Sequence, residues 1–337
     1  MLIGGVSATH GGWRMRWWAA AISLIGLVPS LPVAAAGPDL TPQLSCGVLY
    51  ARHDFAAALT VCAKNADAGD VGDMALMGAL YAGVPGVKPD YSKAMMWDLR
   101  ASDRGNGFAT FAIGKLYANG LGVAKDPVTA LSWERIAANQ GSAAAMIEMG
   151  LSYDNKTASS SLDQALAFTW YMKAAETGDA QGMFDVGAEY EKGEGVAQDA
   201  SQAFTWFLKA AEAGNTTAME NVGVSYRKGH GIAEDDTKAF HWFLLAAKDG
   251  NADAMTNTGI SYSTGAGVTE DYGAAMSWYR KAAALGNATA MYGIGVLYDK
   301  GHGVPRNLNQ ALKWLEKAAN AGSSEAKAAL SSTARRA

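Results

Sequence analysis

Histidine, cysteine and the acidic residues are the groups of this 337-residue chain that could do chemistry, and their spacing argues against an enzyme. Beyond residue 36 the histidines are His53, His230, His241 and His302. None has a histidine or cysteine neighbour at the spacing of the usual zinc signatures. No serine lies in a Gly-x-Ser-x-Gly turn. We therefore expect no catalytic residue, no metal site and no cofactor.

Pairs of glycines, followed in most cases by Val or Ile, raise the question of phosphate binding. They stand at 120/122, 193/195, 229/231, 265/267 and 301/303. A phosphate-binding loop needs such glycines after a strand and at the start of a helix. Here they follow predicted helices and recur five times, so we interpret them as glycines that end a helix with positive φ.

Tryptophan shows why the glycines recur. Beyond residue 36 it occurs only at 97, 133, 170, 206, 242, 278 and 314, in steps of 36 or 37 residues. Each Trp has Asp or Asn seven residues before it and Gly eight residues after it. A second Gly recurs at 78, 114, 150, 187, 223, 259 and 295, each with Tyr three residues later. Five positions aligned in seven units indicate an internal repeat.

Each repeat predicts two helices. In the first, which we call helix A, positions are counted from its recurring Gly. Met219, Val222, Gly223 and Tyr226 then occupy positions −4, −1, 0 and +3, the spacing of an amphipathic helix. Met fills position −4 in six of the seven repeats. A Met stripe can mark a promiscuous binding surface, but at this spacing we favour core packing.

The second helix, helix B, begins at the Asp or Asn seven residues before Trp, where a carboxylate can cap the free backbone N–H groups. It carries Ala-x-x-Trp-x-x-x-Ala-Ala, and one large ring among alanines predicts tight helix–helix packing. Gly at Trp plus eight ends helix B, and the Asn, Asp or Ser that follows caps the next helix A. The predicted fold is all-α, a stack of helix–loop–helix repeats with a period of about 36.

The two ends of the array follow the same pattern in weaker form. We place about eight repeats in residues 40–322 and a capping helix in 323–331. In the first repeat Cys46 falls on helix A and Cys62 on helix B, so a disulfide would join two antiparallel helices. Two buried free thiols are the alternative.

Residues 1–36 have the three parts of a signal peptide. Arg14 and Arg16 precede a short apolar run, 17–28, and an Ala-x-Ala site ends at Ala36. We expect cleavage after Ala36 or, second, Ala35; an uncleaved anchor is the alternative. The mature chain, 37–337, then has no membrane span and is periplasmic or secreted. With a formal net charge of −4, the chain has no basic excess for nucleic acid.

These residues resemble the Sel1-like repeat, a relative of the tetratricopeptide repeat. A clear instance runs from Ala290-Met291 through Gly295, Tyr298, Gly301, Gly303-Val304, Asn307, Ala311, Trp314 and Lys317-Ala318-Ala319 to Gly322. The resemblance implies a right-handed α-solenoid that acts as an adaptor or scaffold. Exported bacterial members are linked to envelope signalling, exopolysaccharide assembly or host contact.

Positions that vary between repeats are the candidates for partner binding. Position −2 of helix A, expected to point away from the core, and position +2 are apolar at the ends of the array and polar in its middle. We predict that a protein or peptide partner binds in a concave groove lined by these central residues: Glu148, Asp185, Glu189, Asn221, Ser225, Asn257 and Ser261. The alternative is an ordinary solvated surface.

A cell-wall glycan is the second class of partner. A peptidoglycan or polysaccharide binder with weak, beta-lactamase-like hydrolase activity would use exposed aromatic residues, and Phe111, Phe184 and Tyr292 at position −3 are the candidates. A cysteine-rich subgroup of the family, linked to penicillin binding, has a Cys pair in every repeat, and the single pair here argues against that activity. The loop 154–161 replaces Gly-x-Gly; we interpret it as a tolerated insertion, with a partner-specific loop as the alternative.

Overall fold

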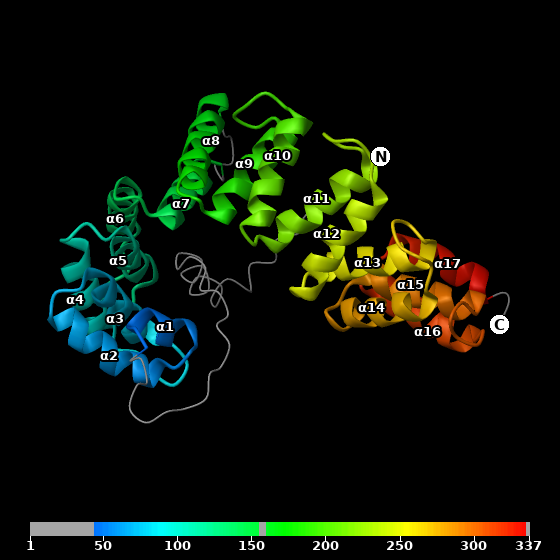
Figure 1. The fold of residues 1–337 in the computed structure, drawn as a ribbon, viewed down its shortest axis with the longest axis horizontal. Coiled ribbons are helices and arrows are strands. Elements are labelled where there is room, and N and C mark those ends of the chain that lie inside the picture. The colour runs from blue at the N-terminus through cyan, green and yellow to red at the C-terminus, as the bar shows by residue number, and fades with distance from the viewer. Residues whose placement is uncertain (1–43, 155–159, 335–337) are drawn as a thin grey trace, which may run out of the picture. The chain divides into compact units, whose positions relative to one another are not determined.

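The protein is all-helical in a computed structural model that describes residues 44–154 and 160–334. Those residues form 17 helices and no strand (Figure 1). The predicted signal peptide and residues 155–159 of the divergent loop lie outside the described residues. No helix in the described part of the chain combines the length and the apolar character that crossing a membrane requires.

Helices A and B alternate along the chain, as predicted. The A helices are α1 (Cys46–Ala51), α3 (Val71–Gly83), α5 (Gly107–Asn119), α7 (Ala143–Asp154), α9 (Ala180–Lys192), α11 (Thr216–Lys228), α13 (Ala252–Thr264), α15 (Ala288–Lys300) and the last helix, α17 (Ser324–Ala334). The B helices are α2 (Phe55–Asp67), α4 (Tyr91–Ser102), α6 (Pro127–Asn139), α8 (Ser161–Glu176), α10 (Ala200–Glu212), α12 (Asp236–Lys248), α14 (Tyr272–Ala284) and α16 (Leu308–Asn320). The predicted capping helix is therefore present and extends three residues further than expected.

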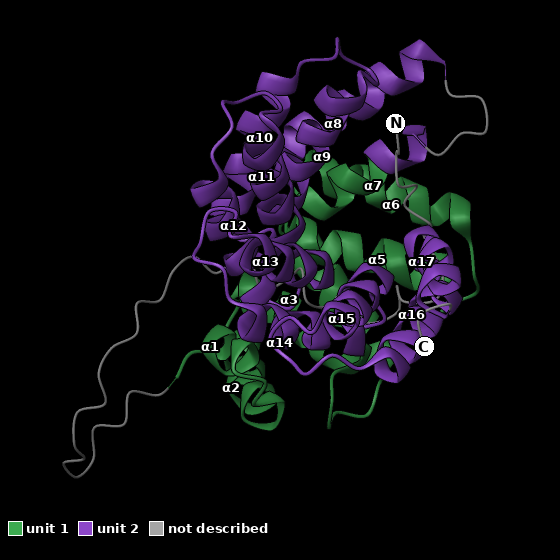
Figure 2. Cartoon of the chain, turned by 90° about the vertical axis from the view of Figure 1, so that its right-hand side faces the viewer, with its two compact units in different colours: residues 1–149 green, residues 150–337 purple. Residues whose placement is uncertain are grey.

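The chain divides into two compact units, residues 1–149 and 150–337 (Figure 2). Consecutive helices pack against each other from α1 to α6 in the first unit and from α8 to α17 in the second. In the first unit the structure joins Cys46 of α1 to Cys62 of α2 in a disulfide, with the Cα atoms 5.0 Å apart. Both cysteines are fully buried, so this bond fastens the shortest helix to the core.

Side-chain caps start the helices where the sequence predicts them, with one exception. Asp235 accepts a hydrogen bond from the backbone N–H of Lys238, and Asn215 accepts one from Ala218. The exception is Asp163, predicted to cap its B helix. The cap there is Ser160, and Asp163 is the third helical residue of a reciprocal capping box. Helix α8 therefore begins three residues before its counterparts, because Ser160 offers an earlier hydroxyl cap.

The Gly-x-Gly loops use their two glycines for different purposes. The first, such as Gly229, ends its helix in the left-handed region at φ 65°. The second, Gly231, also has a positive φ of 75°, and a Cβ there would collide with the carbonyl oxygen of Ala200 in the preceding repeat. The loop thus brings the backbones of neighbouring repeats into contact, which is a structural role and not a phosphate site.

The recurring Gly at position 0 of helix A accommodates the side chain that follows Trp in helix B. A Cβ on Gly223 would lie 2.6 Å from Cε1 of Phe243, well inside contact distance. The same pairing recurs in every repeat: Gly78 with Asp98, Gly114 with Glu134, Gly150 with Tyr171, Gly187 with Phe207, Gly259 with Tyr279 and Gly295 with Leu315. Because this Gly has no Cβ, helix B can approach helix A closely at this position.

Tryptophan itself is less central than the sequence suggests. The alanines around it are buried, but the ring is fully buried only at Trp97 and half-buried in the other repeats. A basic residue three positions later stacks on the ring in five repeats, including that of the buried Trp97, whereas Trp133 and Trp242 have no basic residue there. The ammonium nitrogens of Lys173, Lys209 and Lys281 each lie 4.0 Å from the centroid of the preceding Trp ring.

Substitution of Gly223 tests this packing. Because Phe243 is fully buried and cannot move outward, Gly223→Ala is expected to lower the free energy of unfolding by about 1–3 kcal/mol. Gly72→Ala is the matched control, since Gly72 is helical and exposed and a Cβ there meets only Asp70 Oδ1, at 3.4 Å. Chemical denaturation should show no loss for Gly72→Ala. If both substitutions lowered the free energy of unfolding equally, the close packing of Phe243 on Gly223 would not be the reason for the loss.

Candidate functional site

Position +2 of helix A does not lie on the surface, contrary to the sequence-based prediction. Glu189, Ser225 and Ser261 have exposed fractions of only 3%, 7% and 2%. The prediction was wrong for these three because their polar types suggested solvent, whereas the repeats bury this position except at Ser152, which is exposed. Leu80, Leu116 and Leu297 occupy the same position and are buried too.

Position −2 is half-buried in every repeat, so it is neither a fully exposed surface position nor part of the core. In the second unit, Asp185 of α9 accepts a hydrogen bond from Gln181 at 2.8 Å. Asn257 of α13 donates to Glu220 of α11 at 2.9 Å and accepts from the Arg227 guanidinium at 3.1 Å. The bond of Asp185 lies within α9, whereas the two bonds of Asn257 join α13 to α11.

Asn221 is the member of this row whose amide is unused. It lies on α11, is half-buried, and forms no side-chain hydrogen bond with any residue in 44–154 or 160–334. An amide offers two donors and an acceptor oxygen. The row formed by Asp185, Asn221 and Asn257 on α9, α11 and α13 of the second unit is called the inner row below.

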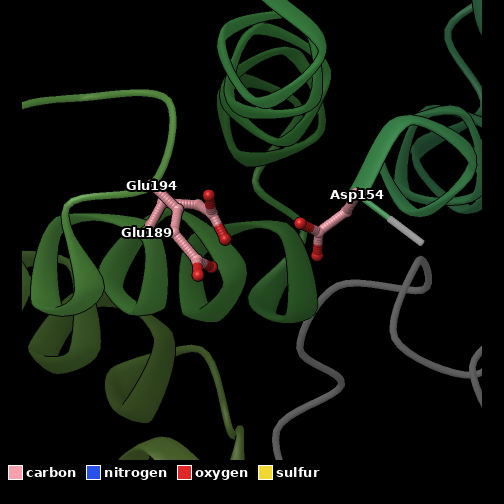
Figure 3. Close-up of side chains that lie close together, drawn as sticks. All are labelled: Asp154, Glu189 and Glu194. Carbon is pink, nitrogen blue, oxygen red and sulfur yellow. The ribbon is translucent and has the colours of Figure 1, made fainter. Parts of the chain in front are cut away.

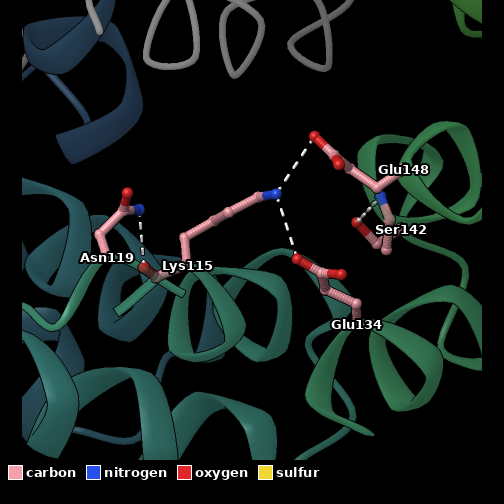
Figure 4. Close-up of polar contacts among 6 residues, drawn as sticks. Lys115, Asn119, Glu134, Ser142 and Glu148 are labelled. Carbon is pink, nitrogen blue, oxygen red and sulfur yellow. Dashed lines mark hydrogen bonds and ion pairs between the residues drawn. The ribbon is translucent and has the colours of Figure 1, made fainter. Parts of the chain in front are cut away.

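Glu148 belongs to the first unit and is already engaged there. Lys115 Nζ lies 3.1 Å from a carboxylate oxygen of Glu148 and 3.1 Å from one of Glu134 (Figure 4). The same ammonium group lies 4.7 Å from the ring centroid of Phe111. This arrangement holds three consecutive helices of the first unit together, so Glu148 has a structural role before any partner is considered.

The aromatic residues considered for sugar binding pack against the protein. Phe111 is buried, with an exposed fraction of 7%. Phe184 is half-buried and its ring centroid lies 5.6 Å from that of Phe207. Tyr292 packs against the apolar cluster around Leu315. None of the three is an exposed aromatic residue of the kind expected for sugar binding.

Two carboxyl groups near the inner row have raised pKa values. Burial, reinforced by the nearby charge of Asp253, raises the pKa of Glu220 to about 7, although Arg227 and the hydrogen bond from Asn257 act in the opposite direction. Burial also raises the pKa of Asp185 to about 7 against the hydrogen bond from Gln181. The acids thus outnumber their cationic partners on this side of α9 and α11.

An acidic cluster that sequence reasoning missed lies beside α9. One carboxylate oxygen from each of Asp154, Glu189 and Glu194 falls within 4.8 Å of the others. Figure 3 shows the Asp154 carboxylate at the end of α7 turned toward the two glutamates of α9 and its following loop. Burial and the charge of Asp154 raise the pKa of Glu189 to about 7. Comparison of position +4 of one helix A with positions +2 and +7 of the next would have found this cluster.

A lone buried carboxyl lies in the first unit. Asp98 is 1% exposed, and neither of its oxygens has a hydrogen-bond partner among the described residues. Burial raises the pKa of Asp98 well above its ordinary value, because a charged carboxylate would be poorly solvated there. It fills the space over Gly78 that an aromatic ring fills in later repeats.

Comparison with known families identifies the repeat. The Sel1 repeat model matches seven consecutive stretches: residues 73–106, 107–142, 143–179, 180–215, 216–251, 252–287 and 288–323. Together these cover well over half of the chain. No curated protein matches the sequence.

Solved structures share the fold. A Sel1 repeat protein from Oxalobacter formigenes is 27% identical with a TM-score of 0.59, covering 90% of this chain and 98% of its own. The protective antigen c5321 of uropathogenic Escherichia coli, which displays an SLR fold, is 29% identical with a TM-score of 0.58, covering 82% of this chain and 67% of its own. The anaphase-promoting-complex hetero-tetramer Cut9–Hcn1, at 16% identity and a TM-score of 0.51, covers 86% of this chain and 54% of its own, and shows the fold alone.

The raised pKa of Glu220 predicts a pH dependence of stability. Between its ordinary value of 4.5 and about 7 the folded carboxyl keeps a proton that the unfolded chain loses, so the free energy of unfolding falls as pH rises through this window. Glu220→Gln removes this term and keeps an oxygen acceptor for Asn257. We expect the variant to exceed the wild type by about 1 kcal/mol at pH 8 and to match it at pH 4, in urea titrations. If the variant and the wild type differed equally at pH 4 and pH 8, the raised pKa of Glu220 would not be the cause of the difference.

Proposed function

The chain belongs to the Sel1 repeat family, and we propose that it is a non-enzymatic scaffold that binds a protein or peptide segment along the inner row of its second unit. Repeat solenoids of this class typically hold protein partners, and a stack of helical pairs has an extended face for that purpose. The proposal concerns the partner class and the surface. The family and the fold are established by the seven matched repeats and the two Sel1-type structures.

Asn221 is the observation that carries the proposal. Its neighbours in the row are held by hydrogen bonds: Asp185 accepts from Gln181, and Asn257 accepts from Arg227 and donates to Glu220. The amide of Asn221 has no such bond within the described residues. A half-buried amide between two fixed polar groups can pair with the N–H and C=O of a peptide backbone at little entropic cost. The row therefore offers a pre-positioned contact for an extended or helical segment.

Charge indicates what kind of segment fits. Asp185, Glu220 and Asp253 lie on or beside the inner row, and Arg227 is the cation that hydrogen-bonds into it. A partner segment with a Lys or Arg side chain would be attracted there, and would stabilise the charged forms of both raised carboxyls. The glycan hypothesis has no comparable support, because its three aromatic residues pack against the core.

Export to the periplasm or beyond is also part of the proposal. Its support is the basic, apolar and Ala-x-Ala pattern of residues 1–36 together with the disulfide of Cys46 and Cys62, a bond that persists in oxidising compartments. Envelope signalling, exopolysaccharide regulation and host contact are the roles that such a location would allow. The similar Escherichia coli protein is described as a protective antigen, which agrees with the last of these.

Export predicts a specific new N-terminus. The protein purified from the periplasm or medium of its native host should begin at Gly37 or, second, at Ala36, because the Ala-x-Ala sites end there. N-terminal sequencing and intact mass measure this directly. A cytoplasmic protein that keeps Arg14 and Arg16 would contradict export.

Site-specific crosslinking tests the binding surface. A photo-crosslinking amino acid in place of Asn221 should capture a defined protein in cells, since this position faces the bound segment. Asn320, exposed at the end of helix α16, is the matched control position. Asn221→Ala in a tagged protein should then reduce recovery of that partner by about tenfold, the cost of one lost hydrogen-bonding group, with the melting temperature unchanged. The same captured set from both positions would contradict the surface.

A further inference from the structure

The cluster of Asp154, Glu189 and Glu194 lies entirely in the second unit and is separate from the inner row. Its three carboxylates come from the end of α7, the middle of α9 and the loop after α9. Glu189 is the centre of the cluster: it is 97% buried, and its Oε2 atom has no hydrogen-bond donor among residues 44–154 and 160–334. A buried carboxylate oxygen without a donor is costly, and it is aimed at two further carboxylates.

Neighbouring positive charge is small. Lys192 Nζ lies 3.2 Å from Glu194 Oε2, but this ammonium group is on an exposed side chain, 53% accessible, and the ion pair is of the surface kind. Asp185 adds a further negative charge that acts on Glu189. Asp154, Glu194 and Asp185 thus all act on the buried Glu189 as negative charges, and Lys192 acts on it as a positive one. These acids attract a cation that can satisfy Glu189 directly.

The triplet occurs once in the array. Positions +4 of one helix A and +2 and +7 of the next hold Asp154, Glu189 and Glu194 here. The equivalent sets elsewhere are Ala82, Leu116 and Leu121; Ala118, Ser152 and Thr157; Glu191, Ser225 and His230; Arg227, Ser261 and Ala266; and Ser263, Leu297 and His302. The carboxylates are therefore not a requirement of the repeat, which tolerates leucine, serine or alanine at the same places.

We propose that Asp154, Glu189 and Glu194 form a binding site for a divalent cation, with Ca²⁺ as the fitting ion. Calcium takes carboxylate oxygens at about 2.4 Å, so two of its ligands can be at most about 4.8 Å apart. The three oxygens lie within that limit as the structure stands. Magnesium, with ligands at about 2.1 Å, allows two ligand oxygens to be at most about 4.2 Å apart, which is a narrower limit. Water would complete the coordination shell on the exposed side of Glu194.

The site would tie the C-terminal end of α7, the part that lies in the second unit, to α9. In the repeats with a Gly-x-Gly loop, that loop packs on the preceding repeat, as Gly231 does on Ala200. The loop after α7 lacks those glycines. A cation held by Asp154 and the two glutamates would supply a contact between neighbouring repeats next to this departure from the pattern.

Calorimetric titration of the chelator-treated mature protein with CaCl₂ tests the proposal. We expect one equivalent of Ca²⁺ to bind, with weaker binding of MgCl₂. Glu189→Gln and Glu194→Gln should each weaken Ca²⁺ binding by about tenfold or more, since each removes a ligand charge. Glu191→Gln is the matched control, because Glu191 is on the same helix, exposed and outside the cluster. Its affinity should equal that of the wild type.

Three outcomes would overturn the site: no Ca²⁺ binding at millimolar concentration, equal weakening by Glu191→Gln, or wild-type affinity in Glu189→Gln. Asp154→Asn provides an independent variant at the end of α7, away from the core of α9, should Glu189→Gln fail to fold. Circular dichroism of each variant confirms that its helices are intact. The result is independent of partner binding, because the inner row is unchanged in all of these proteins.

Discussion

The contact between a glycine in the middle of helix A and the side chain that follows Trp in helix B sets the architecture of every repeat. The absence of a Cβ lets an aromatic, leucine or acidic side chain lie directly on the helix backbone, as Phe243 does on Gly223. Glycine costs about 1 kcal/mol in a helix, and the array accepts that cost seven times. In return, the two helices approach closely, and the alanines of helix B are buried in the core.

Function is left to the positions that this packing does not use. Position 0 and the caps hardly change between repeats, whereas positions −2, +2, +4 and +7 vary freely. Where those positions are polar, two different arrangements result. On α9, α11 and α13 they form a half-buried row with an unused amide at Asn221. Between α7 and α9 they bring three carboxylates around a buried glutamate oxygen. The inner row and the acidic cluster each result from a few side chains, whereas the packing of helix A on helix B stays the same.

The repeat, its caps and its loop glycines could be predicted from the sequence because they follow from backbone chemistry. An Asp or Asn before a helix and a Gly after it act through hydrogen bonds and φ angles that belong to single residues. Burial of individual polar positions could not be predicted in this way. Ser225 and Ser261 lie under neighbouring helices, and only the packing of helix on helix decides that. The importance of Trp was overestimated for the same reason, since packing leaves its ring half-buried in six of the seven repeats.

The acidic cluster was missed because its members lie 35 and 5 residues apart and occupy three different repeat positions. When the repeats are aligned, each of the three acids looks like an ordinary charged residue on the surface. Their meeting depends on how α7 packs on the following hairpin. The same is true of Lys115, whose bridge to Glu134 and Glu148 gives a structural role to a residue that the sequence suggested for binding.

Hydrogen–deuterium exchange of the protein with its captured partner is the most direct test of the central claim, that the A helices of the second unit bind the partner. The account predicts slower exchange on partner addition in α9, α11 and α13, with α10, α12 and α14 unchanged. Slower exchange confined to the B helices, or to the loops between hairpins, would contradict it.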